Sequence, residues 1–185
     1  MRLISKKKAE GILLRYAGWI EEVSKRYDVP SAAIKAILSQ EMEMMDYGDL
    51  AADVVVRLGF FKKKDSSTGY AQIFGYVGLN AANFAVDRGI ATYESLGIRC
   101  DHRLDPDCKE DVRLIWKLLH DDPMANIELA TLNLLCAADE VIGRTDFETF
   151  TEHDMKMVFT RYNSKSLNIT SYGEEAYKRY AGSLV

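Results

Sequence analysis

The sequence predicts a mainly α-helical fold with a small β excursion near residues 55–69. Apolar residues recur with a helical period along most of the chain, and few segments alternate strictly between apolar and polar residues as a half-buried strand does. The composition is that of an ordinary globule, since 48% of the 185 residues are hydrophobic and 28% are charged. We therefore predict a single domain over residues 1–185.

The N-terminal part predicts two helices separated by a proline turn. The first covers roughly residues 7–27, where apolar side chains fall on one face. Residues 28–30, Asp-Val-Pro, end it, because proline restricts the residue before it. The second helix begins at Ser31, a good N-cap, and runs to about Met45.

The middle of the chain is harder to assign. Residues 50–61, LAADVVVRLGFF, fit either a helix or a strand, and residues 62–69, KKKDSSTG, are typical of an exposed turn. A further helix is expected from near Tyr70 to about Asp87, followed by a polar loop over residues 98–108.

The C-terminal part predicts a series of helices. They are expected near residues 109–121, 124–142, 151–162 and 171–182, from their helical periodicity. Pro123 suits the start of the second of these, because proline is favoured at the first position of a helix.

The charge and hydropathy patterns exclude several classes of partner. Net charge is -4 with both signs interspersed, which argues against nucleic acid, because duplex binding needs a basic face. Charges interrupt the apolar stretches before they reach the length of a membrane span. The N-terminus is basic but lacks an apolar run and a cleavage site, so no signal peptide is predicted. A cytoplasmic protein and a piece of a larger exported protein both remain open, and the sequence predicts nothing about oligomeric state.

The chain has three cysteines, an odd number, so at least one is free or pairs between chains. Cys100 and Cys108 flank a polar loop, which a disulfide would close if the protein is exported. The alternative, a metal held by the cysteine, histidine and aspartate side chains of this loop, has a spacing that matches no strong site, so no metal is predicted. Cys136 lies in an apolar run and is expected to be a buried thiol.

Glu41 is the strongest candidate for chemistry. It follows Ile34 by seven residues, Ile37 by four and Leu38 by three, so it shares their apolar helix face, whereas Glu43 points away. Burial disfavours a charged carboxylate and should raise its pKa. A glutamic acid that stays protonated near neutral pH suits a general acid for glycosidic cleavage. Pairing with a core cation, or a solvent-facing place at a helix end, is the alternative.

Four short segments follow one another in a characteristic order. They are residues 27–42, YDVPSAAIKAILSQEM, ending just past Glu41; residues 66–72, SSTGYAQ; residues 126–135, NIELATLNLL; and Tyr162-Asn163, which precede Tyr172-Gly173 and a closing helix. Gln72, at the end of the second, follows Glu41 by about 30 residues. In order and spacing they resemble the motifs of soluble lytic transglycosylases and goose-type lysozymes, members of the lysozyme-like superfamily.

The chain also departs from these families. Met42 stands where they usually have serine after the glutamate, and Ala71 where they usually have methionine. The insert at residues 46–65 and the loop at residues 88–108 are not typical of them. These departures concern the substrate more than the fold.

The resemblance implies an enzyme that cleaves peptidoglycan glycan strands between N-acetylmuramic acid and N-acetylglucosamine, without a cofactor. It implies Glu41 as the catalytic acid. The implied substrate-binding residues are Ser67, Gly69, Tyr70, Gln72, Tyr162 and Asn163. Lysines 62–64 are expected to be a solvated patch that could also help hold an anionic strand.

Each implied binding residue also has a plain structural interpretation. Gly69 provides backbone freedom at a turn or a close approach to a sugar, and otherwise is a loop glycine. Gln72 hydrogen-bonds an acetamido or hydroxyl group, or is a helix-surface amide. Tyr162 brings its hydroxyl near Glu41 and its ring against a sugar, or is a core tyrosine. Asn163 contacts ligand or terminates a helix.

Two mechanisms remain open at this point. The resemblance to lytic transglycosylases implies a single glutamate, with the substrate's own hydroxyl as the attacking group, and we favour this mechanism. A hydrolytic lysozyme needs a second carboxylate, for which Asp65 is the best-placed candidate, ahead of Asp46, Asp49 and Asp53.

Two further classes stay as alternatives. One is a non-catalytic lysozyme-fold protein that binds cell wall or belongs to a phage or secretion assembly, which Met42 and the insert favour. The other is a helical protein of unrelated function. Activity on the cell wall would require export, phage delivery or a place in a larger secreted protein.

Overall fold

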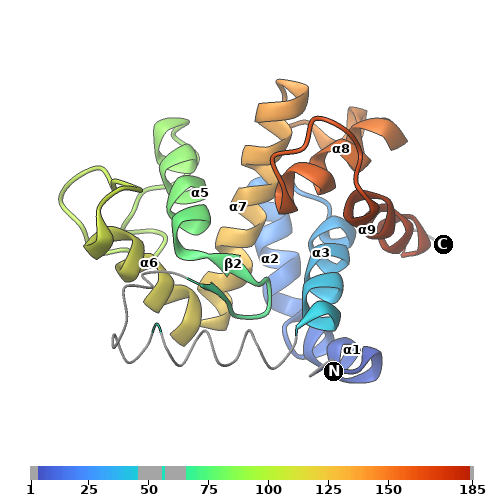
Figure 1. Cartoon of the computed structure of the whole chain (residues 1–185), viewed down its shortest axis with the longest axis horizontal. Helices are drawn as coiled ribbons and strands as arrows, with labels where there is room; N and C mark the ends of the chain where they lie inside the picture. The colour runs from blue at the N-terminus through green and yellow to red at the C-terminus, as the bar shows by residue number, and fades with distance from the viewer. Residues whose placement is uncertain (1–3, 46–55, 57–65, 184–185) are drawn as a thin grey trace.

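The computed structural model describes residues 4–45, 56 and 66–183 and is mainly helical, with one small antiparallel sheet (Figure 1). This confirms the predicted fold class. The helices are α1 (Lys6–Arg15), α2 (Ala17–Tyr27), α3 (Ser31–Met44), α5 (Gly75–Asp87), α6 (Lys109–Asp121), α7 (Pro123–Ile142), α8 (Glu152–Asn163) and α9 (Ser171–Gly182), with a 3-10 turn at Phe147–Thr149; the strands are β1 (Ser67–Thr68) and β2 (Ile73–Phe74).

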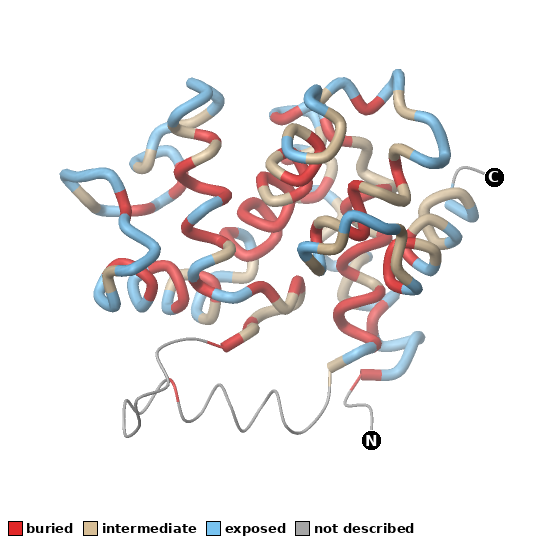
Figure 2. The backbone as a smooth tube through the Cα atoms, turned by 45° about the horizontal axis from the view of Figure 1, so that its top comes forward, coloured by how far each residue is buried: buried red, intermediate tan, exposed pale blue. Residues whose placement is uncertain are grey.

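Helix α7 is the centre of the fold. Its buried residues occur on all sides of the helix, as expected for a helix enclosed by others. It contacts α2, α3, α5, α6 and α8, and α9 packs against α3 and α8. Figure 2 shows the buried residues concentrated along α7 and on the sides of its neighbours that face it. The candidate residues therefore come from helices arranged around one common core.

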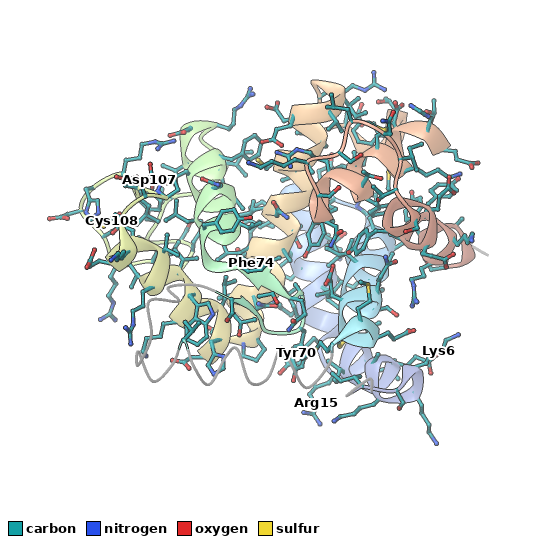
Figure 3. The ribbon with its side chains drawn as sticks, in the orientation of Figure 1. Lys6, Arg15, Tyr70, Phe74, Asp107 and Cys108 are labelled. Carbon is teal, nitrogen blue, oxygen red and sulfur yellow. The ribbon has the colours of Figure 1, made fainter. Side chains whose placement is uncertain are left out.

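The predicted first helix is in fact two helices. Tyr16 separates α1 from α2 and has non-helical backbone angles, φ -99° and ψ 10°. Its ring packs against that of Tyr70, with ring centroids 5.6 Å apart. Figure 3 shows Tyr70 reaching from the hairpin toward the end of α1, where Arg15 lies. This long-range contact, together with the weak helix propensity of Gly18, explains why the continuous apolar pattern does not give one helix.

Helix α3 begins at Ser31 as predicted, but Ser31 is not its N-cap. Pro30 occupies the N-cap position and Ser31 is the first helical residue, without a side-chain cap. The left-handed Asp28 ends α2, with φ 54°. The proline turn was therefore predicted correctly, but the role given to Ser31 was wrong.

The helix expected from Tyr70 begins only at Gly75. A tight turn occupies residues 69–72, because Gly69 and Gln72 both have positive φ, 73° and 44°. The turn joins β1 to β2, in which Ser67 pairs with Phe74 and Thr68 with Ile73. The β excursion was thus predicted in the right region, but its second strand lies beyond residue 69.

The helices predicted in the C-terminal part are confirmed. Asp122 caps α7 by accepting from the backbone N–H of Met124 at 2.8 Å, and Pro123 is the first helical residue as expected. Gly143, with φ 76°, ends α7 in the left-handed conformation that glycine favours. No helix in the described part of the chain is both long and apolar enough to cross a membrane.

The cysteine predictions are partly wrong. Cys100, Cys108 and Cys136 are all free thiols, so the structure contains no bridge across the polar loop. Cys136 is half-buried, because it lies on the side of α7 that faces a cavity. Among the described residues no group of three or more potential ligands could hold a metal ion.

Several predictions concern residues outside the described ranges. They include the helix-or-strand segment 50–61, apart from the buried Val56, and the lysine run 62–64. All four candidates for a second carboxylate also fall there: Asp46, Asp49, Asp53 and Asp65.

Candidate active site

Glu41 lies in the last turn of α3 and is only 7% exposed. The helical spacing therefore predicted its burial correctly. The hydroxyl of Tyr172 donates a hydrogen bond of 2.5 Å to Glu41 Oε1. Ile37, Leu38 and Met42, which are all buried, surround it on the same helix. A carboxylate in this setting keeps a small exposed surface while a fixed donor orients it.

Two tyrosines stack beside this carboxylate. The rings of Tyr162 and Tyr172 have centroids 6.5 Å apart and planes 17° apart. Burial, followed by the negative charge of Glu41, raises the pKa of both hydroxyls well above that of a free tyrosine. Both therefore stay protonated over the ordinary pH range, and Tyr172 remains a donor to Glu41.

Tyr172 donates directly to Glu41, and the hydroxyl of Tyr162 has an acceptor of its own. The hydroxyl of Tyr162 donates instead to the backbone carbonyl of Ala71, at 3.1 Å. Tyr162 is a buried tyrosine whose hydroxyl is satisfied by Ala71, which is the structural alternative given for it. The charge of Glu41 still acts on this hydroxyl, and the Tyr162 ring lies against that of Tyr172. Sequence reasoning noted Tyr172 as part of the fourth motif but assigned it no role.

Gly173 explains how Tyr172 comes so close to α3. A Cβ at this position would lie 2.6 Å from the carbonyl oxygen of Lys156 and nearer still to Thr160 Oγ1. The absence of a side chain thus lets the start of α9 pack directly on α8. In the sequence, Gly173 could be recognised only as part of the fourth segment. Its spacing does not indicate that it packs against α8.

The turn at Gly69 is held by Asn126 of α7. The Asn126 amide donates to the carbonyl of Thr68 at 3.1 Å and accepts from the N–H of Ala71 at 2.9 Å. A Cβ on Gly69 would overlap this amide, lying 2.9 Å from Oδ1 and closer to Nδ2. The second and third sequence segments therefore meet here, and Gly69 serves both the positive φ and the close approach.

The side chain of Gln72 forms hydrogen bonds across the same turn. Its Nε2 donates to the carbonyl of Gly69 at 2.8 Å, and its Oε1 accepts from Ser67 Oγ at 3.2 Å. Gln72 is therefore not a helix-surface amide. Both ends of its amide group are hydrogen-bonded within the hairpin, so they are not directed at a ligand. Together with Ser67 it fixes the shape of the hairpin whose Ala71 carbonyl receives Tyr162.

Helix α6 supports the hairpin from the other side. Trp116 Nε1 donates to Ser66 Oγ at 3.0 Å, and His120 Nδ1 lies 2.9 Å from Thr68 Oγ1. The rings of Trp116 and His120 stack with centroids 4.8 Å apart. These residues were missed as contributors to the site, because no sequence signal connects α6 to residues 66–68.

Glu43 lies on the side of α3 away from the apolar face that carries Glu41, but it is not exposed to solvent. It is 9% exposed, because α9 covers that side of α3. Arg179 donates to both of its oxygens, at 2.7 and 3.1 Å. The hydrogen bond from Arg179 lowers the pKa of Glu43 in spite of its burial. Glu43 is therefore an ion-paired structural carboxylate.

A cavity of about 440 Å³ adjoins Tyr162. Its walls come from α5, α7, the end of α8 and the residues that follow, and they include Asn80, Asn133 and Asn163. An ion pair between Arg161 and Glu140, 2.6 Å long, lies in the wall. The three asparagine amides in its lining can bind neutral polar groups. Glu41 is not among the residues that line it.

An exposed pair of aromatic side chains lies at the N-terminus of α5. Phe74 and Tyr76 are each 41% exposed, and their ring centroids are 5.8 Å apart. Tyr76 also lines the cavity. In Figure 3, Phe74 marks the end of the hairpin where α5 begins. Exposed aromatic rings beside an amide-lined cavity suit the apolar face and polar edge of a sugar.

Comparison of the chain with protein-family models, with curated proteins and with solved structures finds no match.

Proposed function

We propose that this protein cleaves peptidoglycan glycan strands as a lytic transglycosylase, with Glu41 as acid and then base. The observation that carries the proposal is the buried Glu41 at the end of α3, held by the Tyr172 hydroxyl at 2.5 Å. The convergence of the four sequence segments around it supports the same function. Tyr162 links the fourth segment to the hairpin, and Asn126 links the third segment to Gly69.

The chemistry needs one carboxyl group. Protonated Glu41 gives its proton to the glycosidic oxygen as the bond to C1 of N-acetylmuramic acid breaks. The resulting carboxylate then removes the proton from a hydroxyl of the same sugar, which attacks C1 and closes an anhydro ring. Glu41 ends the cycle protonated, and no water is consumed. Tyr172 holds the carboxyl group in one orientation through both steps.

The cavity beside Tyr162 is the proposed place for the neighbouring part of the glycan strand. Its asparagines offer both donors and acceptors to acetamido and hydroxyl groups. The exposed rings of Phe74 and Tyr76 extend the same surface. Asn163, which the resemblance implied as a binding residue, lines this cavity, whereas Ser67 and Gln72 shape the hairpin beside it.

Replacement of Glu41 by glutamine tests the proposal. We expect Glu41→Gln to reduce the rate of cell-wall lysis, followed by turbidity, at least about 100-fold, as for loss of a general acid. Glu43→Gln is the matched control, since Glu43 is a buried glutamate on the same helix but pairs with Arg179. We expect Glu43→Gln to retain most of the lytic rate at a temperature where it is folded. Equal rates for Glu41→Gln and wild type would refute the proposal.

A second function is favoured by one observation. Glu41 is 7% exposed and does not line the cavity, whereas the aromatic pair and the cavity could hold a sugar without it. A non-catalytic cell-wall-binding protein would use that surface alone. Incubation with cell wall and with chitin oligomers distinguishes the two: binding that Tyr76→Ala abolishes, with no product released by wild type, favours the binding protein.

A further inference from the structure

Polar contacts join α3 and α9 on both sides of Glu41. Gln40 Nε2 donates to the backbone carbonyl of Tyr172 at 3.1 Å, in a buried contact. Two residues beyond Glu41, Glu43 receives Arg179, which also donates to Ser39 Oγ at 2.9 Å. The α3 segment that carries Glu41 is thus tied to the α9 segment that carries its hydrogen-bond donor.

The contact from Gln40 does more than satisfy a backbone carbonyl. Tyr172 lies in the first turn of α9, where the carbonyl groups accept from N–H groups one turn later in the helix. The hydrogen bond from Gln40 is therefore additional to the backbone hydrogen bond that this carbonyl can accept within α9. Its effect is to fix the position of the peptide group from which the Tyr172 side chain extends.

Stability of the fold does not explain why a glutamine occupies position 40. It is 4% exposed, and its Oε1 is buried without a hydrogen-bond partner among the described residues. An unsatisfied buried amide oxygen destabilises the folded state, and an apolar side chain of similar shape would avoid that loss. The amide at this position is therefore better explained by the contact that its nitrogen makes.

We infer that Gln40 is a positioning residue that holds the Tyr172 hydroxyl on the Glu41 carboxyl group. It acts through the backbone of Tyr172 and does not touch substrate. The inference rests on the proposed function for its catalytic consequence, but the geometric part applies to Glu41 whatever the protein does. Gln40 and Tyr172 should consequently behave as one unit in their effect on Glu41.

The test uses Gln40→Met, which keeps the length of the side chain and removes both the donor and the unpartnered oxygen. We expect its Tm to be at or above that of wild type, while the lytic rate falls about tenfold or more, since small misplacements of a catalytic group have large effects. A hydrogen bond to a carboxylate favours its charged form, so its loss should move the alkaline limb of the pH–rate profile to higher pH. Tyr172→Phe should shift that limb in the same direction, and the double variant should add nothing.

A readout independent of lysis separates this inference from the proposed function. The titration of the Glu41 side chain, followed by carbon NMR of labelled glutamate and assigned with Glu41→Gln, should move to higher pH in both Gln40→Met and Tyr172→Phe. This result would support the inference even if wild type released no product, in which case only the proposed function fails. A wild-type titration in Gln40→Met, or additive shifts in the double variant, would overturn the inference.

The matched control is a buried amide elsewhere. Asn83 Nδ2 donates to the backbone carbonyl of Leu104 at 2.8 Å, away from α3 and α9. Asn83→Leu should lower Tm through the loop that it holds and leave the Glu41 titration unchanged. A shift of the Glu41 titration in Asn83→Leu as large as in Gln40→Met would show that any loss of a buried amide has this effect and would also overturn the inference.

Discussion

At the scale of single residues, the site depends on a hydrogen bond between a buried carboxyl group and a buried phenol. Tyr172 and Glu41 come from helices far apart in the chain and meet at 2.5 Å. The Tyr172 ring also stacks on Tyr162, so ring packing and hydrogen bonding contribute separately. A substitution that removes only the hydroxyl can therefore distinguish the two contributions.

Tyr172→Phe should keep the stacked ring and remove the donor to Glu41. We expect the free energy of unfolding to fall by about 1–3 kcal/mol, because a buried acceptor loses a partner. The lytic rate should fall as well. Tyr27→Phe is the control, since Tyr27 donates to the buried Glu128 at 2.6 Å, on α2 and α7. It should lose similar stability in urea unfolding and no lytic activity; equal loss of activity in both variants would contradict a specific role for Tyr172.

Gly69 can be tested against a glycine with similar backbone angles. Gly69→Ala suffers both from its φ of 73° and from overlap with the Asn126 amide, whereas Gly89, with φ 67°, has open space around it. Gly89→Ala should destabilise by about 1–2 kcal/mol, the left-handed strain alone. Gly69→Ala should destabilise by clearly more in urea unfolding. Equal values would show that Asn126 can move aside without loss.

At the scale of elements, the position of α9 on α8 decides where the donor to Glu41 lies. The two helices approach closely at Gly173, beside Thr160 and the carbonyl of Lys156. Arg179 then ties the same helix to α3 through Glu43. The start and the body of α9 are thus fixed by different neighbours.

Gly173→Ala should displace the start of α9 and with it Tyr172. We expect a loss of about 1–3 kcal/mol in the free energy of unfolding, the range for overpacking a tight contact, together with reduced lytic activity. Gly182→Ala, at the other end of α9, meets nothing within 4 Å and should be neutral or slightly stabilising. Thermal unfolding of both variants checks this, and similar behaviour of the two would contradict the close packing at Gly173.

Some helix boundaries could be predicted from the local sequence and others could not. The Asp-Val-Pro turn and the start of α7 at Pro123 follow from backbone restrictions that single residues impose, and both were predicted. The break at Tyr16 and the late start of α5 depend on contacts with the hairpin. Such contacts join residues distant in the chain, which periodicity does not report.

At the scale of the whole molecule, the site is assembled by contacts between distant segments. Glu41 meets Tyr172, Tyr162 meets Ala71, and Asn126 meets the turn at Gly69. Helical spacing was sufficient to place Glu41 on the apolar face of its helix, because that depends on one helix, whereas the burial of Glu43 under α9 depends on packing. The hydrogen bond from Tyr172 to Glu41 could not be predicted, since it depends on how α9 packs on α3 and α8.

The ion pair between α3 and α9 should make stability fall in acid. Arg179 lowers the pKa of Glu43 below its ordinary value of 4.5, so the pair's contribution is present above that pH and is lost as pH falls through the folded-state value. We expect Tm to fall between neutral pH and about pH 3, and to fall less steeply in Glu43→Gln. Parallel pH dependences for the two proteins, measured by thermal unfolding, would contradict this assignment.

Analysis of released muropeptides by mass spectrometry, with wild type and Glu41→Gln side by side, tests the central claim most directly. Wild type should release products ending in anhydro-N-acetylmuramic acid, and Glu41→Gln, shown by circular dichroism to be folded, should release almost none. Release of the same products at the same rate by Glu41→Gln would contradict the role of Glu41, and reducing ends in place of anhydro ends would contradict the transglycosylase mechanism.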